Sequence, residues 1–407
     1  MAISFLYLDL NSFFASCEQQ ENPELRGRPV AVISTLAENT SVIAASYEAK
    51  KFGIKTGTKV YEARKMCPDI IFVAGNHRIY IEYHHKIIDA VDSCVPIHSV
   101  CSIDEIACEL KGSQKITENA VALAEKIKKA LRERVGEFMK GSIGIGPNIL
   151  LAKMAADMKK PDGLTIVDSQ DLPQRLFGLK LQDVPGIGYK MNQRLNERGV
   201  HTMERLLTSS VAEMRSLWGG VLGERYYRLF RGEQIEMTKS EQKSIGHSHV
   251  MPPKQRSHEG SKIVAMKLIY KTANRLRKAG FMAREMSVSI KCIGVSYELP
   301  TRYEKSFKFN ETQDTSHFIG LIEDFFTQIP VSVKPLKASV VLSNFIHEAE
   351  HQLNFFDNDK KNHLFKIVDR INEKYGKNAV YPSSLLKEMK SAPTRIAFTR
   401  IPELDEI

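Results

Sequence analysis

Three carboxylates lie where the surrounding residues predict buried β-structure. Asp104 and Glu105 are adjacent within residues 97–110, a stretch that is apolar and rich in β-branched residues, as strands and hairpins are. Asp9 follows residues 3–8, an apolar run that is typical of a buried strand ending at this point. Because a carboxylate buried without a partner is strongly destabilising, these three positions need a chemical explanation.

Two explanations fit the pair at 104 and 105. A hairpin turn with solvated acids accounts for Asp104 and Glu105 alone as well as a site does. Asp9 favours a site, because two strand-borne acidic positions far apart in the sequence suggest one cluster that holds Mg²⁺ with substrate phosphates. Adjacent residues of a regular strand point to opposite faces, so we expect a bend, a bulge or the hairpin edge at this place.

The elements that must position these acids alternate along residues 1–167. Apolar runs of strand length alternate with stretches of helical periodicity, and some strands are joined as hairpins. We therefore expect a mixed sheet with helices mainly on one face. Ser12 is the expected N-cap of a helix that starts at Phe13. A further helix is expected over residues 148–158, with Lys153 and Lys160 on it or next to it.

The composition is that of a soluble globular protein. Hydrophobic residues make up 43% and charged residues 26% of the 407 residues, enough chain for two to four domains. No apolar run approaches the length of a membrane span, and the N-terminus lacks the basic region of a secretory signal. Six cysteines without a CxxC pair predict reduced thiols of a cytoplasmic protein rather than zinc ligands.

The positive charge is concentrated in one part of the chain. The net charge is +10, and residues 239–308 alone contain 15 Lys and Arg against 5 acids, a local excess of 10. A solvated surface normally mixes both signs, so this segment favours a nucleic-acid or acidic-surface footprint. Its expected DNA contacts are Lys243, Arg256, Arg284, Arg302 and Lys305.

Residues 168–235 have helical composition and contain a Pro-Gly-x-Gly turn within residues 183–188. Such a turn frees consecutive backbone N–H groups at a helix N-terminus, which can hold a DNA phosphate without reading sequence. The turn alone is weak evidence, but the basic helices on either side favour a helix-hairpin-helix. Gly186, Gly188 and Lys190 are its expected DNA contacts.

Taken together, these residues resemble the Y-family, or translesion, DNA polymerases. The resemblance runs from Ile3 to about Phe345. It rests on the Asp9 strand with Asn-Ser-Phe-Phe-Ala, on residues 47–53 (Tyr-Glu-Ala-Lys-Lys-Phe-Gly), 102–105 (Ser-Ile-Asp-Glu), 155–163 (Ala-Ala-Asp-Met-Lys-Lys-Pro-Asp-Gly) and 183–188 (Asp-Val-Pro-Gly-Ile-Gly), in the family's order.

This resemblance implies an α/β (α+β) polymerase right hand. A mixed-sheet palm would be interrupted by small fingers and followed by a helical thumb with a helix-hairpin-helix and an α/β little finger. The implied bounds are 1–17 and 77–167 for the palm, 18–76 for the fingers, 168–235 for the thumb, 236–245 for a linker, 246–346 for the little finger and 347–407 for a C-terminal tail.

The resemblance also implies residue roles. Asp9, Asp104 and Glu105 would be the catalytic residues and, with the Leu10 carbonyl, would bind two Mg²⁺ ions. Within this set, we expect Asp104 to bridge both ions and Glu105 to touch mainly the catalytic one. The nucleotide would be bound by Phe13, Phe14, Tyr47, Lys50 and Lys160.

Phe14 matches the steric gate, a ring that occupies the place of a ribose 2′-hydroxyl, whereas Tyr47, Lys50 and Lys160 match the triphosphate clamp. Two residues depart from the family pattern. Lys50 stands where Arg is frequent, which keeps the charge without the bidentate geometry. Ala44 stands where a hydroxyl residue is frequent, which removes one phosphate contact.

Residues 352–356 resemble the short peptide by which bacterial polymerases bind the ring-shaped sliding clamp. Gln352, Leu353, Phe355 and Phe356 would be its anchors, and a peptide that packs on its own domain is the alternative. The long segment after this peptide resembles the UmuC branch, for which a UmuD-type partner is expected. Residues 47–53 and 155–163 instead resemble the DinB branch.

The function predicted from the sequence is error-prone DNA synthesis at damaged templates, with primer-template DNA and dNTPs as substrates. Two alternatives use part of the same features. A DNA-binding accessory subunit would need the basic segment and the tail but no catalysis. A nucleotidyl cyclase would share the two-metal chemistry but would need neither the helix-hairpin-helix nor the basic segment.

Overall fold

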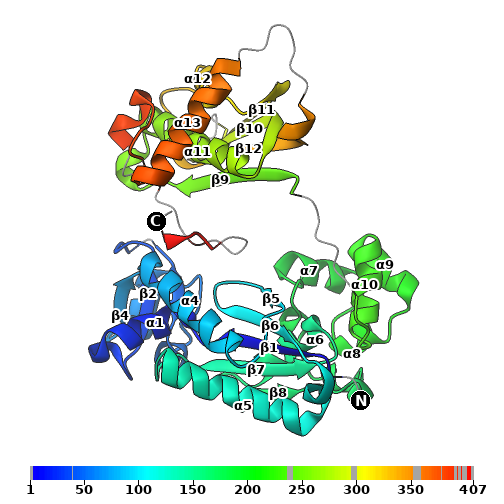
Figure 1. Cartoon of the computed structure of the whole chain (residues 1–407). Helices are drawn as coiled ribbons and strands as arrows, with labels where there is room; N and C mark the ends of the chain where they lie inside the picture. The colour runs from blue at the N-terminus through cyan, green and yellow to red at the C-terminus, as the bar shows by residue number, and fades with distance from the viewer. Residues whose placement is uncertain are drawn as a thin grey trace. The chain divides into compact units, whose positions relative to one another are not determined.

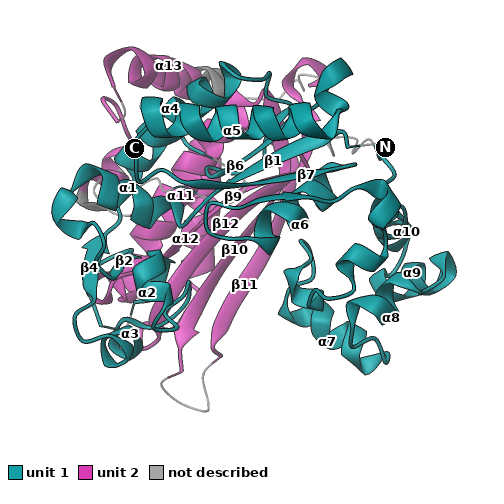
Figure 2. Ribbon diagram, turned by 90° about the horizontal axis from the view of Figure 1, so that it is seen from below, with its two compact units in different colours: residues 1–237, 395–405, 407 teal, residues 238–394, 406 magenta. Residues whose placement is uncertain are grey.

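The computed structural model describes residues 3–38, 40–235, 242–294, 300–351, 359–376 and 378–388, together with residues 392, 396 and 401–404. The chain forms two compact units (Figure 2). Unit 1 comprises residues 1–237, 395–405 and 407, and unit 2 comprises residues 238–394 and 406. Within the described residues, every helix is too short or too polar to span a membrane.

Unit 1 is built on a five-stranded mixed sheet of order β5-β6-β1-β7-β8 (Figure 1). Strand β1 lies at its centre and pairs antiparallel with β6 and β7, whereas β8 runs parallel to β7. This arrangement confirms the expected mixed sheet. The strands are β1 (Phe5–Leu10), β5 (Ser99–Val100), β6 (Glu105–Glu109), β7 (Gly141–Gly146) and β8 (Leu164–Ile166).

Helices α1 (Phe13–Glu21), α4 (His77–Asp92) and α5 (Thr117–Arg134) share a core with one side of this sheet. Alternation along β1 places Leu6 and Leu8 on that side. Both are fully buried in the same cluster as Ile87 of α4 and Ile127 of α5.

Helices lie mainly on the side of α1, α4 and α5, as expected, whereas α6 (Ile149–Met158) covers the opposite face. Tyr7 of β1 is buried there with Ala152 and Ala156 of α6. Glycine in β7 allows the helix to approach closely, because a Cβ on Gly144 would lie 1.9 Å from the carbonyl oxygen of Ala152. This approach carries the side chains of α6 to the end of β1 where Asp9 lies.

A three-stranded sheet of order β3-β2-β4 forms a smaller layer of unit 1 with its own core. Ile33, Val42 and Ala49 are buried in this core. The elements are β2 (Val30–Ile33), β3 (Val42–Ala45), α2 (Tyr47–Lys50), α3 (Val60–Met66) and β4 (Ile71–Ala74).

Unit 1 is helical over residues 189–229, as expected from the composition of residues 168–235. Short helices pack around the fully buried Phe230. They are α7 (Tyr189–Glu197), α8 (Met203–Leu207), α9 (Val211–Trp218) and α10 (Val221–Leu229).

Unit 2 contains a four-stranded antiparallel sheet of order β11-β10-β12-β9, packed against α11 (His258–Lys278) and α12 (Thr315–Phe326). Val288 and Val340 are buried under these helices, and alternate residues on the other face are exposed, among them Ser244, Ser248 and Ser306. The strands are β9 (Ser244–Val250), β10 (Phe281–Ile293), β11 (Arg302–Thr312) and β12 (Lys334–His347).

Residues after the sheet of unit 2 also belong to its core. Phe365 of α13 (Asp359–Tyr375) and Leu385 are buried in the same cluster as the helix-facing strand residues. Arg277 of α11 forms a buried ion pair with Asp369 of α13, with Nε 2.6 Å from Oδ2. The last segment of the chain returns to unit 1, where Ile401 and Leu404 pack against the core of the five-stranded sheet.

Candidate active site

Asp9 and Glu105 are direct partners across two strands. The register of β1 and β6 pairs Asp9 with Glu105, so their side chains lie on the same face of the sheet. This is the face that α6 covers. Tyr7 and Ala107, which pair two residues away on the same two strands and so share this face, pack against α6. The two carboxylates therefore converge at one end of a rigid sheet, as the sequence predicted for a site.

Asp104 reaches this region from a turn. It precedes the first residue of β6, so strand alternation does not force its side chain away from Glu105. Its backbone carbonyl accepts a hydrogen bond from the Leu10 N–H at 2.9 Å, and its Oδ1 accepts one from Ser102 Oγ at 2.5 Å. Burial raises the pKa of Asp104, and the charges of Asp9 and Glu105 raise it further, whereas the Ser102 hydroxyl lowers it.

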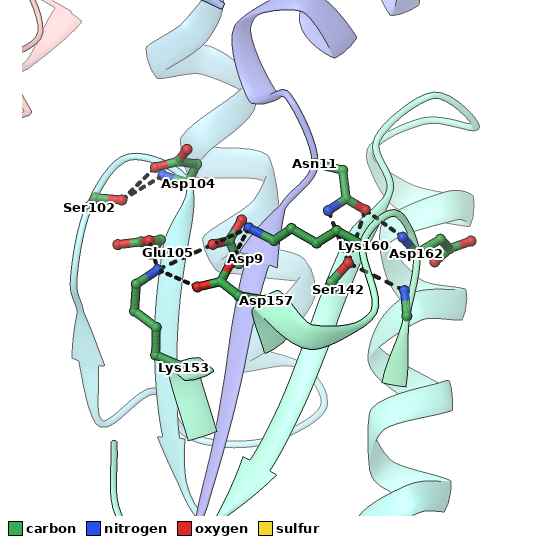
Figure 3. Close-up of polar contacts among 11 residues, drawn as sticks. Asp9, Asn11, Ser102, Asp104, Glu105, Ser142, Lys153, Asp157, Lys160 and Asp162 are labelled. Carbon is green, nitrogen blue, oxygen red and sulfur yellow. Dashed lines mark hydrogen bonds and ion pairs between the residues drawn. The ribbon is translucent and has the colours of Figure 1, made fainter. Parts of the chain in front are cut away.

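Two lysines bind the carboxylates of the sheet, and Lys153 contacts the most of them. Its ammonium group forms a hydrogen-bonded ion pair with Glu105 and lies 3.3 Å from Asp9 Oδ2 and 3.8 Å from Asp157 Oδ2 (Figure 3). Lys160 Nζ lies 2.8 Å from Asp9 Oδ2 and 2.6 Å from Asp157 Oδ1. Burial alone would lower the pKa of Lys160, but Asp9 and Asp157 raise it overall.

Neither Lys153 nor Asp157 was assigned a role from the sequence. Asp157 holds the two lysines at fixed positions through one carboxylate. The sequence carried a signal for both residues. Gly144 in an expected strand, together with alanines one turn apart in the next helix, indicates a close strand–helix contact that would place this helix at the carboxylates.

The loop that carries Lys160 is tied to the sheet by Asn11 and Ser142. Asn11 Oδ1 accepts a hydrogen bond from the Asp162 N–H at 2.7 Å, and Ser142 Oγ accepts one from the Gly163 N–H at 3.3 Å. Asn11 Nδ2 also donates to Ser142 Oγ at 3.0 Å. These bonds fix the loop beside Asp9, as Figure 3 shows.

Tyr47 and Lys50 bring the small three-stranded layer to the same region. Both belong to α2, and Lys50 Nζ lies 4.2 Å from the centre of the Tyr47 ring. Burial lowers the pKa of Lys50, and the nearby Lys160 lowers it further. Burial raises the pKa of Tyr47, on which the charges of Lys160 and Asp9 also act. The expected triphosphate residues therefore lie close enough to influence one another.

Phe13 and Phe14 begin α1, directly after β1. Phe13 is buried in the core at 3% exposure, whereas Phe14 is only partly buried and stacks on Tyr80 of α4, with ring centroids 4.4 Å apart. Ser12 precedes the helix as expected, but its predicted capping bond is absent. Its backbone is left-handed, with a φ of 51°, and among the described residues its buried Oγ has no hydrogen-bond partner. Side-chain capping needs an extended N-cap backbone, which explains the difference.

A divalent cation fits the chemistry of these donors. Asp9, Glu105 and Asp104 offer the carboxylate oxygens that Mg²⁺ prefers, and lysine ammonium groups already lie against the oxygens of Asp9 and Glu105. Among the described residues, no three His, Cys, Asp or Glu side chains form a ready metal cluster. Figure 3 shows the Asp104 side chain turned toward Ser102, while Asp9 and Glu105 face Lys153.

The Pro-Gly-x-Gly turn lies at the start of a helix, as predicted. Gly188 is the N-cap of α7, and Lys190 is the second residue of that helix. Gly186 has a φ of +93°, and a Cβ there would lie 2.0 Å from the Tyr226 hydroxyl, which donates to the Pro185 carbonyl at 2.8 Å. Only glycine fits this position. The contact with Tyr226 of α10 therefore fixes the shape of the turn.

The basic residues of unit 2 fall into different environments. Lys243 is exposed next to β9, and Arg256 donates from Nε to the Met251 carbonyl at 2.9 Å. Arg284 lies at a bulge in β10 and pairs with Glu311 at 3.2 Å.

Strand alternation separates the two remaining residues, Arg302 and Lys305. Arg302 lies on the face of β11 away from the helices, whereas Lys305 lies on the face where Tyr303 and Phe307 meet the core. A single sheet face cannot present both Arg302 and Lys305 to one ligand. The expected clamp anchors Gln352, Leu353, Phe355 and Phe356 lie outside the described residues, as does most of the expected linker.

Family models match three parts of the chain. Residues 8–157 match the impB/mucB/samB family, and residues 242–355 match the C-terminal domain of that family. Residues 182–234 match a model described as the DNA polymerase-iota thumb domain. These ranges contain the carboxylate site, the basic sheet and the Pro-Gly-x-Gly turn respectively.

Curated relatives cover most of the chain. DNA polymerase IV of Moorella thermoacetica is 37% identical over 294 residues, which are 71% of this chain and 73% of that protein. DNA polymerase IV of Pelotomaculum thermopropionicum is 28% identical over 95% of this chain and 98% of its own length. DNA polymerase IV 2 of Bacillus subtilis is 27% identical over 96% of both chains.

Solved structures show the same architecture. A Y-family DNA polymerase chimera of Dbh with a Dpo4 segment aligns with a TM-score of 0.68 and 25% identity, over 84% of this chain and 99% of that one. The insertion ternary complex of Dbh DNA polymerase aligns with a TM-score of 0.55, also at 25% identity and over the same shares of the two chains. The α/β right-hand fold with a helix-hairpin-helix thumb is thereby confirmed.

Proposed function

The chain belongs to the Y family of DNA polymerases, and from this premise we propose how its residues carry out DNA-templated DNA synthesis. It is a DNA-directed DNA polymerase of the translesion type, as its sequence predicted. The accessory-subunit and cyclase alternatives do not account for polymerase-family matches over residues 8–157, 182–234 and 242–355. Asp9, Asp104 and Glu105 are the catalytic residues of the proposal.

The observation that carries this assignment is the cross-strand pair of Asp9 and Glu105, with Asp104 in the adjoining turn. We assign these three side chains, with the Leu10 carbonyl, to two Mg²⁺ ions. When bound, the ions lower the pKa of the primer 3′-hydroxyl and neutralise charge on the phosphoryl oxygens. For Glu105 to serve this role, Lys153 must release it, which gives Lys153 the function of a counter-cation in the metal-free enzyme.

The triphosphate is assigned to the cationic side of the same site. Lys160 and Lys50 supply positive charge to the triphosphate oxygens, and Tyr47 supplies a hydroxyl from the same helix as Lys50. Asn11 supports this clamp indirectly, because it fixes the loop that carries Lys160. Phosphoryl transfer depends on positioning and electrostatic stabilisation, which this arrangement provides without a covalent intermediate.

Primer extension with Mg²⁺ and all four dNTPs tests the proposal directly. Wild-type protein should extend a primer on both undamaged and damaged templates, and chelation of the metal should stop extension. A DNA-binding accessory subunit would instead bind duplex with a steep salt dependence and incorporate nothing.

Template and primer are assigned to the thumb turn and to the exposed face of the unit 2 sheet. In the thumb, Gly186, Gly188 and Lys190 present backbone N–H groups and a charge at the start of α7. In unit 2, the exposed face combines Arg302 with serines such as Ser248 and Ser306, which suits phosphate contacts that position a duplex without reading its sequence. Lys243 and Arg284 extend this assignment, whereas Lys305 faces the core side.

Phe14→Ala should admit ribonucleotides. Phe14 is the partly buried ring at the start of α1, and truncation to Ala opens room for a 2′-hydroxyl. We expect the preference for dNTP over rNTP to fall by roughly a hundredfold. The ratio of kcat/KM for dATP and ATP measures it, and incorporation of dATP serves as the internal control. An unchanged ratio would remove Phe14 from the gate.

The sliding clamp is the proposed protein partner, through Gln352, Leu353, Phe355 and Phe356. Gln352→Ala combined with Leu353→Ala should weaken binding to an immobilised bacterial clamp by about tenfold or more, since anchor residues dominate such interfaces. Asn354→Ala changes the same peptide between its anchors and should bind like wild type. Retention of the double variant at the wild-type level would contradict the assignment. Because the segment after residue 356 resembles the UmuC branch, a UmuD-type protein is proposed as a second partner, and the same binding assay tests it.

A further inference from the structure

Two residues on one face of α1 contact the same tyrosine of α4. Phe14 and Glu18 are separated by one helical turn, so their side chains lie on one face of α1. The Phe14 ring stacks on Tyr80 with an interplanar angle of 25°, and Glu18 Oε1 accepts a hydrogen bond from the Tyr80 hydroxyl at 2.6 Å. Tyr80 is thus held at its face by Phe14 and at its tip by Glu18.

Burial restricts the movement of both side chains in this contact. Tyr80 is 1% exposed and Glu18 is 8% exposed, so neither side chain can turn toward solvent. A buried tyrosine hydroxyl needs a partner, and the carboxylate supplies one from the same helix that carries Phe14. Burial raises the pKa of Glu18, and the Tyr80 hydroxyl counteracts part of that rise. The Tyr80 ring is therefore a fixed backing for the Phe14 ring.

Selection against a 2′-hydroxyl depends on where the gate ring stands, and displacements on the order of 1 Å are sufficient to change rates strongly. We propose that Glu18 is a positioning residue for sugar selection, which acts through its hydrogen bond to Tyr80 to fix the Phe14 ring. The proposal rests on the assignment of Phe14 as the gate. It assigns a role in substrate specificity to a carboxylate that lies away from the reacting atoms.

A second pair of the same kind provides a matched control. Glu21 and Tyr83 lie three residues further along α1 and α4, and the Tyr83 hydroxyl donates to Glu21 Oε1 at 2.8 Å. Tyr83 is buried in the same core cluster as Tyr80, and its hydrogen bond also joins α1 to α4. Phe14 stacks on Tyr80, so a loss of the second pair tests the packing of the two helices without a direct effect on the gate.

The experiment measures the ratio of kcat/KM for dATP and ATP in the full chain. Glu18→Leu and Tyr80→Phe each remove the hydrogen bond. The first replaces the carboxylate with an apolar side chain of similar size, and the second keeps the ring that stacks on Phe14. We expect either change to lower the preference for dATP by roughly tenfold, through faster ATP incorporation rather than slower dATP incorporation. Glu18→Gln keeps an acceptor oxygen for Tyr80 and should stay within about threefold of wild type.

The combination of changes makes the result specific. Because Glu18→Leu and Tyr80→Phe remove the same hydrogen bond between the two side chains, the double variant should lose no more selectivity than the larger of the two single losses. Glu21→Leu and Tyr83→Phe should keep the wild-type ratio. Wild-type selectivity in Tyr80→Phe, or an equal loss in Tyr83→Phe, would overturn the proposal. Should Glu18→Leu fail to fold, Tyr80→Phe and Glu18→Gln still decide the question.

The Phe14→Ala variant separates this inference from the gate assignment. If Phe14→Ala admits ribonucleotides but Tyr80→Phe does not, the gate assignment stands and the role of Glu18 is wrong. If Phe14→Ala leaves the ratio unchanged, the gate assignment itself fails, whatever the Glu18 variants do.

Discussion

Asp104→Asn should lower the rate of nucleotide incorporation by about 10³-fold or more, a rise of about 4 kcal/mol in the activation free energy. The amide has the size of the carboxylate and still accepts the hydrogen bond from Ser102 Oγ. It lacks the negative charge with which Asp104 would hold Mg²⁺ in the proposed site. Single-turnover incorporation of one dNTP at saturating DNA measures the effect.

Stability should not fall in this variant, and the direction of the Asp104 pKa explains why. Burial and the nearby carboxylates raise that pKa, so the folded metal-free protein disfavours the charged form. A raised pKa means that this group stabilises the fold at low pH and loses that contribution as pH rises through the folded pKa. A neutral amide removes the cost of the charged form, so unfolding cannot explain a lost rate.

Asp162→Asn is the matched control for charge. Asp162 lies in the loop that follows Lys160, and its carboxylate pairs with Lys128 at 3.0 Å and is 46% exposed. The same change of residue there should leave the incorporation rate within about threefold of wild type, because the half-exposed Asp162 carboxylate pairs with Lys128 and not with a residue of the proposed metal site. Full activity of Asp104→Asn, or an equal loss in Asp162→Asn, would refute a specific role for Asp104.

The sequence predicted where the carboxylates lie but not how the helix reaches them. Apolar runs next to acidic residues located β1 and β6. The alternation of side chains along a strand showed that Asp104 and Glu105 could not both face Asp9 from a regular strand. The structure resolves it without a bulge, because Asp104 lies in the turn before β6. Lys153 was missed because helical periodicity gives the face of a helix, whereas its target depends on the close contact of Gly144 with Ala152.

The basic sheet was predicted only in outline. Charge counting identified the segment, but it treated Arg302 and Lys305 alike. Period-two alternation separates them, since Lys305 shares its face with Tyr303 and Phe307, which meet the core. Composition measures how much charge a strand carries, and register decides which side of the sheet receives it.

The helix after the sheet shows a further limit of sequence patterns. The sequence over residues 362–375 has an amphipathic pattern that is typical of a helix, and α13 lies there, but such a pattern does not identify the element against which the helix packs. In the structure, α13 is joined to α11 by the ion pair of Arg277 and Asp369, which are 8% and 7% exposed. Oppositely charged residues 92 positions apart carry no mutual signal in a single sequence.

Arg277→Met should destabilise the docking of α13 by about 3–5 kcal/mol, because it leaves Asp369 buried without its counter-charge. The guanidinium donates twice to Asp369, from Nε at 2.6 Å and from Nη2 at 3.1 Å. It also donates from Nη1 to the Gln313 carbonyl at 3.0 Å and to Thr315 Oγ1 at 2.8 Å. Hydrogen exchange of the amides of α11 and α13 in the full chain measures the loss.

The neighbouring residue supplies the control. Lys278 pairs with Glu373 of α13 at 3.2 Å, and these side chains are 41% and 55% exposed. Lys278→Met removes the same charge between the same two helices, yet it should change the protection by no more than about 0.5 kcal/mol, since water replaces an exposed ion pair. An equal effect of the two variants would mean that net charge, rather than a buried pair, attaches the helix.

Replacement of both partners distinguishes the ion pair from simple packing. Arg277→Met with Asp369→Leu removes both buried charges and should recover most of the protection lost in Arg277→Met, because a hydrophobic pair of similar volume can match a buried ion pair. Asp369→Leu alone should be as harmful as Arg277→Met, since it strands the guanidinium. If the double variant is instead the sum of the two single losses, the pair is not coupled and α13 is held by Phe365 and its neighbours alone.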